Sequence, residues 1–266
     1  MRVIAIDWSG ARTGATGKIW LAEVVDGHLL RLEPGRDRDQ LAGHLIAEAE
    51  RDPDLVVGFD FAFAFPVWFQ QELGVASADD VWERVDEEGE RWLQECPPPF
   101  WGRSGTRRPE RPLYRRTEEE VRERTGAQPK SVFQIGGAGA VGTGSIRGMP
   151  VLRRLTGAGF AVWPFHDPAL PLVVEIYPRL FTGPLVKTDP AERAALMEAR
   201  YPELDSSHRQ LTIAFDDALD AAVSAIEMAR HAEELMRLPP ARDALERREG
   251  AVWYPRAPYW EAGNGS

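Results

Sequence analysis

The segment that most constrains the fold is the apolar run at residues 54–60, DLVVGFD. Its continuous apolar character is typical of a central strand that is covered on both faces. Residues 37–51 precede it with helical spacing, because Leu41, Leu45, Ile46 and Ala49 share one face. A helix that leads into such a strand indicates a crossover connection in an α/β protein.

Three shorter apolar segments come before this helix, at residues 2–6, 17–25 and 28–34. The Asp26-Gly27 pair between the last two is typical of a tight turn, so the three segments predict a meander. Further strands are predicted at 160–165 and 171–178, and helices at 79–95, 190–200 and 215–237. This order favours an α/β fold with a mixed sheet and helices packed on it.

The chain has 266 residues, 43% of them hydrophobic, which suits one α/β domain with an insertion. Residues 97–130 interrupt the regular pattern with the proline-, glycine- and arginine-rich stretch PPPFWGRSGTRRPERPLYRR. We therefore predict a single domain at 1–240, an inserted cap at approximately 97–130, and a C-terminal tail at 241–266.

Composition excludes several classes of protein. No apolar run approaches 18 residues, so no membrane partner is expected, and the start MRVIAIDWSG does not resemble a signal peptide. The single cysteine, Cys96, cannot form an internal disulfide, which favours a cytoplasmic location. A net charge of −10 argues against a protein that coats long nucleic acids by charge alone.

Acidic residues follow the predicted strands where those strands end. Asp7 ends the first strand, Asp60 ends the strand at 54–60, and Glu175 lies near the end of the strand at 171–178. Ligands of α/β sheets gather at the carboxyl ends of strands, so Asp7 and Asp60 are expected side by side. Each acid alone also fits a simple turn residue.

Two more acids, Asp217 and Asp220, lie near the start of the late helix in the stretch FDDALDAAVSAI. Their i, i+3 spacing places both on one helix face. Asp216 fits a helix N-cap, but Asp220 lies further in, among apolar residues, where a cap does not explain it.

Several carboxylates in one buried place repel each other unless a cation intervenes. Mg²⁺ and Mn²⁺ prefer oxygen ligands, and two such ions about 3.5–4 Å apart form the clamp used for phosphodiester hydrolysis. We therefore predict that Asp7, Asp60, Asp217 and Asp220 are metal ligands, and that Glu175 is a further ligand or supports one.

The motifs IAIDWSG, VVGFDFAFAFP, VVEIYP and DDALDAAVSA, in this order, resemble the ribonuclease H-like superfamily, and DALDA is similar to the late-helix acids of its Holliday-junction resolvase branch. With FQIGGAGAVGTGSIRGMP and WPF, the whole chain looks like domain-of-unknown-function family 429, which is described as predicted nucleases. The resemblance implies a mixed five-stranded sheet flanked by helices and a metal-dependent nuclease site at Asp7, Asp60, Asp217 and Asp220. The long insertion departs from a minimal resolvase.

Two other functions stay open. DWSGARTGATGK at 7–18 and GGAGAVGTGS at 136–145 are glycine-rich loops that could cradle phosphate, as in an ATP-dependent phosphotransferase of actin-like fold. The same glycines also suit a plain connection into a helix. A third possibility is a non-catalytic module that binds nucleic acid or protein.

A basic segment runs from Trp101 to Arg116, with six arginines, one acid and a local net charge of +5. We predict that its residues Arg107, Arg108, Arg115 and Arg116, together with Lys187, bind the phosphates of a nucleic acid. The alternative is a solvated loop whose arginines pair with neighbouring acids.

Overall fold

The computed structural model describes residues 1–137 and 139–256. Among these residues one mixed sheet of six strands forms, in the order β3-β2-β1-β4-β6-β5. Its strands are β1 (Arg2–Asp7), β2 (Trp20–Val25), β3 (His28–Glu33), β4 (Leu55–Phe59), β5 (Ala161–Val162) and β6 (Leu172–Glu175). The meander β1–β3 is antiparallel, whereas β1, β4, β6 and β5 run parallel.

The α/β class and the mixed sheet are therefore confirmed, but the sheet has six strands instead of five. The sixth strand is β5, which uses only two residues of the predicted strand at 160–165. It pairs with β6 at the edge of the sheet.

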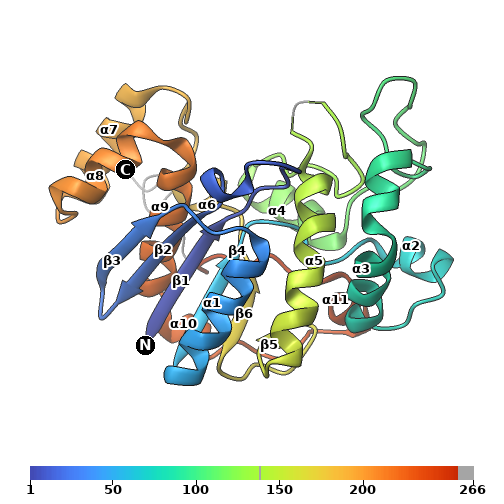
Figure 1. Cartoon of the computed structure of the whole chain (residues 1–266), viewed down its shortest axis with the longest axis horizontal. Coiled ribbons are helices and arrows are strands. Elements are labelled where there is room, and N and C mark those ends of the chain that lie inside the picture. Colours follow the sequence, from blue (N-terminus) through green and yellow to red (C-terminus); the bar gives the residue numbers. More distant parts are fainter. Residues whose placement is uncertain (138, 257–266) are drawn as a thin grey trace.

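Helices cover both faces of the sheet (Figure 1). On one face lie α1 (Arg38–Arg51), α3 (Ala78–Glu95) and α5 (Val141–Gly157), and on the other lies α9 (Asp216–Arg230). Alternation along each strand divides the core: Ile4 and Ile6 of β1 pack with the first group, and Val3 and Ala5 pack with α9. Because side chains alternate with a period of two, the position of each acid along its strand determines on which face of the sheet it lies.

The predicted insertion is packed against the body and contains α4 (Arg116–Thr125). Its base is closed by backbone hydrogen bonds, because Trp101 N–H donates to Phe133 at 3.0 Å and Ile135 N–H donates to Trp101 at 2.9 Å. A short α2 (Val67–Glu72) connects β4 to α3.

Glycines make this closure possible. A Cβ on Gly102 would lie 2.3 Å from the Gly136 carbonyl oxygen, and one on Gly142 would lie 2.1 Å from the Val132 oxygen. Close backbone packing therefore accounts for Gly136 and Gly142 in the glycine-rich loop without an anion.

After β6 the chain forms α6 (Arg179–Thr182), α7 (Pro190–Arg200) and α8 (Ser206–Ala214) before it enters α9. The late helix is shorter than predicted, because α9 ends at Arg230 and a separate α10 (Ala232–Met236) follows. None of the described helices is long and apolar enough to cross a membrane.

The predicted C-terminal tail is part of the packed body as far as residue 256. It contains α11 (Ala244–Glu249), and its Trp253 is buried, with a backbone N–H that donates to the Glu175 carbonyl at 2.7 Å. Residues 257–266 of the predicted tail lie outside the described residues.

Candidate active site

Asp7 and Asp60 lie side by side at the carboxyl edge of the sheet. Ile6 and Phe59 are paired in the parallel β1–β4 ladder, and Asp7 and Asp60 follow them. The Trp8 N–H donates to Asp60 Oδ1 at 2.7 Å, which ties the two strand ends together. Both acids fall at the alternate positions that face α9, since Ala5 of β1 packs against that helix and Gly58 of β4 faces its Met228.

Helix α9 brings Asp217 and Asp220 to the same edge. Phe215 is extended (φ −127°, ψ 125°) and separates α8 from α9, so both acids lie in the first turns of a new helix. Asp217 is partly exposed, whereas Asp220 is 4% exposed. The helix is a core helix, and its first turns present carboxylates to the ends of β1 and β4.

Electrostatics show that the four carboxylates are close. Burial raises the pKa of Asp7 well above its ordinary value, and the negative charges of Asp60, Asp220 and Asp217 raise it further. Burial also raises the pKa of Asp60 to about 7 and that of Asp220 to about 6. The site thus concentrates negative charge that favours binding of a proton or a metal cation.

Lys187 supplies the cation within this cluster. Its ammonium bonds with Asp220 Oδ2, and the lysine side chain is 36% exposed. Burial lowers the pKa of Lys187, but the charges of Asp220, Asp7 and Asp60 outweigh this effect and raise it. The sequence predicted Lys187 as a phosphate contact, and the structure places it beside the acids.

The chemistry of these side chains fits a hard divalent ion. The donors are carboxylate oxygens, and Asp220 Oδ1 is buried with no hydrogen-bond partner among the described residues. Within residues 1–137 and 139–256, however, no three His, Cys, Asp or Glu side chains are already grouped as a metal site. Ion binding would therefore draw the carboxylates together.

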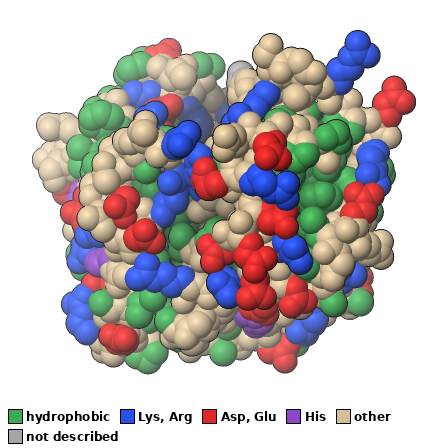
Figure 2. All heavy atoms as spheres, turned by 45° about the vertical axis from the view of Figure 1, so that its right-hand side comes forward, with side chains coloured by type: hydrophobic (Ala, Val, Ile, Leu, Met, Phe, Trp, Pro, Cys, Tyr) green, Lys and Arg blue, Asp and Glu red, His purple; other side chains and the backbone are tan. Residues whose placement is uncertain are grey.

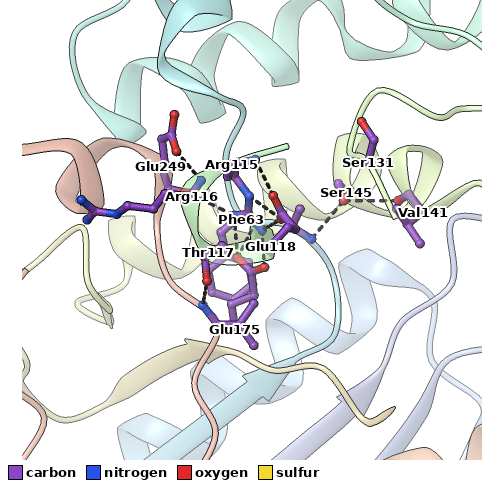
Figure 3. A network of polar contacts seen from close by, with 12 residues as sticks. Phe63, Arg115, Arg116, Thr117, Glu118, Ser131, Val141, Ser145, Glu175 and Glu249 are labelled. Atoms are coloured by element: carbon purple, nitrogen blue, oxygen red, sulfur yellow. Dashed lines mark hydrogen bonds and ion pairs between the residues drawn. The ribbon is translucent and has the colours of Figure 1, made fainter. Parts of the chain in front are cut away.

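Glu175 lies apart from the other acids, on the opposite face of the sheet. It is 3% exposed and bonds with the Arg115 guanidinium through both oxygens, at 2.9 and 2.5 Å (Figure 3). The Phe63 N–H donates to the same carboxylate at 3.0 Å. Both Glu175 oxygens are thus already bonded within the protein, which favours a supporting role over that of a metal ligand, the two roles that the sequence left open.

Arg115 is likewise unavailable to substrate. It is 1% exposed, and its guanidinium also donates to Glu118 and, at 3.0 Å, to the Glu249 carbonyl. Burial raises the pKa of Glu118, an effect that Arg115 opposes. Arg115 therefore holds β6, α4 and α11 together instead of binding phosphate.

Neighbouring bonds extend this network to α5 and the C-terminal segment. Arg116 bonds with Asp243 at 2.7 and 3.0 Å, and Thr117 Oγ1 accepts from the Val252 N–H. Ser145 Oγ donates to Val141 and accepts from the Ala62 N–H, two residues after Asp60 (Figure 3). Arg116 thus has an acidic partner within the protein, so the prediction that it binds substrate loses its basis.

Arg107 and Arg108 remain exposed, as the sequence predicted. The Arg108 guanidinium lies 5.7 Å from the Trp101 ring centroid and 5.9 Å from that of Tyr114. A cation over two aromatic rings, at the protein surface, forms a patch that suits phosphate and an exposed base.

A cavity of about 490 Å³ adjoins the acids. Asp60, Asp220 and Lys187 line it, and so does the buried ion-pair group of Glu175, Arg115 and Glu118. The insertion also contributes residues 126–130. Tyr177, Arg179 and Lys130 also line it. Sequence reasoning singled out none of these three, although Tyr177 and Arg179 follow β6 at the edge that carries the acids. In Figure 2 the upper edge of the molecule is hollowed, with basic side chains in and beside the hollow.

The loop at 7–18 has no obvious phosphate cradle. Arg38 donates to the carbonyls of Ser9 and Ala11 at 2.7 and 2.6 Å, and Arg147 donates to that of Gly10. Gly10 also touches the backbone of α5, since a Cβ there would lie 2.5 Å from the Gly144 nitrogen. Arg38 of α1 and Arg147 of α5 thus hold the loop through its carbonyl groups. These contacts do not favour the function of an ATP-dependent phosphotransferase.

No protein-family model, no curated protein and no solved structure matches this chain.

Proposed function

We propose that the protein is a metal-dependent hydrolase that cleaves phosphodiester bonds in nucleic acid. Mg²⁺ or Mn²⁺ would be held by Asp7, Asp60, Asp217 and Asp220. The observation that carries this proposal is that Asp7 of β1 lies within electrostatic range of Asp60 at the end of β4 and of Asp217 and Asp220 on α9, with Asp220 Oδ1 buried and unpartnered among the described residues.

The order of the elements supports the resemblance to ribonuclease H-like nucleases. Three antiparallel strands come first, and a helix then leads into β4, which pairs parallel to β1. A late helix, α9, adds its acids at the carboxyl edge of the sheet. The resemblance rests on these elements and on the order of the motifs.

Different groups of residues would have different roles in such a reaction. A bound divalent ion would supply Lewis acidity and a water of lowered pKa. The carboxylates would hold that ion, and the basic groups of the adjoining cavity would orient the phosphodiester. The exposed Arg107 and Arg108 would hold the flanking nucleic acid.

The proposal is tested by measuring both metal binding and cleavage for the wild type and for the variant Asp7→Asn. We expect saturating Mn²⁺ to raise the Tm of the wild type by about 5–10 °C, because an ion that binds only the folded state stabilises it. Asp7→Asn should lose most of that rise and reduce cleavage of an end-labelled oligonucleotide at least about 100-fold.

Asp39→Asn is the matched control. Its side chain is 96% exposed on α1 and lies outside the carboxylate cluster, so both readouts should remain those of the wild type. A wild-type Tm that does not respond to millimolar Mn²⁺ would refute the metal site, and with it the proposed hydrolysis.

A further inference from the structure

The bond between Lys187 and Asp220 leaves one carboxylate oxygen unused. Asp220 is 4% exposed, its Oδ2 bonds with the lysine ammonium, and its Oδ1 has no partner in the described part of the chain. A buried oxygen without a partner is unfavourable unless a ligand satisfies it. Lys187 therefore satisfies only one of the two Asp220 oxygens.

The backbone of Lys187 is anchored while its side chain spans the site. Lys187 lies between α6 and α7, and its carbonyl accepts from the guanidinium of Arg193, a residue that is 4% exposed. The same guanidinium donates to Ile213 at 2.9 Å, at the end of the helix before α9. One buried arginine thus ties the lysine backbone to the end of α8, the helix that precedes α9.

The surroundings give the ammonium a second place to bind. Lys187 and Asp220 both line the cavity of about 490 Å³, so an ammonium that leaves Asp220 stays within that space. The side chain is 36% exposed, and the neighbouring Val186 is 57% exposed, so solvent reaches this segment. A flexible four-carbon stem on a fixed backbone suits a change of partner.

We propose that Lys187 is a positioning residue that exchanges partners: its ammonium holds Asp220 before a metal ion binds, and contacts a substrate phosphate in the adjoining cavity after the ion takes Asp220. This inference rests on the proposed metal site. Lys187 then competes with the metal ion for Asp220, and it strengthens binding of the substrate.

Opposite effects of one substitution on two ligands test this exchange. Lys187→Met should bind Mn²⁺ about tenfold more tightly than the wild type, measured by electron paramagnetic resonance of the free ion without substrate, because a competing positive charge is removed. The same variant should bind a short single-stranded oligonucleotide about tenfold more weakly in saturating Ca²⁺, measured by fluorescence anisotropy. A merely structural role would weaken both.

Arg237→Met is the control for loss of a positive charge, because the Arg237 side chain is 79% exposed and does not line this cavity. Its Mn²⁺ affinity should equal that of the wild type. Lys187→Gln provides a second variant if Lys187→Met does not fold. Lys187→Arg, which keeps the charge, should retain oligonucleotide binding better than either.

The outcomes separate this inference from the proposed function. If the wild type and Lys187→Met both fail to bind Mn²⁺, the metal site itself is refuted. If the wild type binds Mn²⁺ and Lys187→Met binds it equally or more weakly, the exchange is refuted and the metal site stands. Tighter Mn²⁺ binding with unchanged oligonucleotide affinity would refute the transfer of Lys187 to phosphate.

Discussion

Alternation along the strands decides on which face of the sheet each acidic side chain lies. Asp7 and Asp60 occupy the alternation that faces α9, whereas Glu175 is in register with Phe59 and faces the other way. The sequence alone could not separate Glu175 from Asp60, because the rule needs the β4–β6 register, in which Glu175 pairs with Phe59. Acids at the ends of neighbouring strands lie on the same face of the sheet only when their paired positions have the same parity.

At this scale the raised pKa of Asp60 predicts how stability depends on pH. A carboxylate whose pKa is higher in the folded state stabilises the fold at low pH, and this contribution is lost as the pH rises through the folded-state value, about 7 for Asp60. In EDTA, Asp60→Asn should therefore be more stable than the wild type at pH 8, by on the order of 2 kcal/mol.

The difference between the two proteins should shrink as the pH falls below about 7, and it should be smallest below the ordinary aspartate pKa of 3.8, where Asp60 is protonated in both the folded and the unfolded wild type. Asparagine keeps the oxygen that accepts from the Trp8 N–H, so the substitution changes charge more than packing. Urea denaturation at several pH values measures this. A difference in unfolding free energy that does not vary with pH would contradict the buried, repelling carboxylate.

Whole elements are held around the site by the buried arginine at the start of α4. Arg115 joins β6 through Glu175, α4 through Glu118 and α11 through the Glu249 carbonyl (Figure 3). Each bond connects segments that are distant in the sequence. The positions of the insertion and of the C-terminal segment therefore depend on one guanidinium.

Arg115→Met is expected to destabilise the protein by about 3–5 kcal/mol, because it leaves two buried carboxylates without a counter-charge. Arg116→Ala is the adjacent control. Its ion pair with Asp243 is open to solvent, so the loss should be much smaller than that of Arg115→Met. Chemical denaturation of both variants gives the comparison, and equal losses would show that Arg115 has no special structural role.

At the scale of the whole molecule, the proposed nucleic-acid substrate is a polyanion, whereas the protein has a net charge of −10. Of the four predicted arginines, only Arg107 and Arg108 are exposed and without an acidic partner in the described structure. The double substitution Arg107→Ala/Arg108→Ala should weaken oligonucleotide binding and reduce the slope of log affinity against log salt by about 1.4–1.8, since each phosphate contact contributes about 0.7–0.9.

Titrations at several salt concentrations measure that slope, and the Mn²⁺-dependent rise in Tm should stay unchanged in the same variant. Arg153→Ala serves as the control, because this exposed arginine already pairs with Glu83 and Asp86 on α3. If the double variant and the control give the same slope as the wild type, the loop at 103–111 does not contact the substrate.

Local patterns were sufficient to predict much of this fold. Helical spacing identified α1, α3 and α7 to within a residue, and the apolar run at 54–60 identified the central strand. The placement of Asp7 and Asp60 followed from parallel strand ends. Distant pairing partners were beyond local pattern, because Arg115 pairs with Glu175 and Arg116 with Asp243, at separations of 60 and 127 residues.

The position of α9 along the chain also determines when the site can form during synthesis. Asp7 and Asp60 are made early, but α9 begins at Asp216. Translation at about 5–20 residues per second places roughly 10–40 s between Asp7 and Asp220. A nascent chain that ends between residues 60 and 187 therefore carries two of the four carboxylates and neither Lys187 nor Asp220. A chain terminated at that stage lacks the proposed active site.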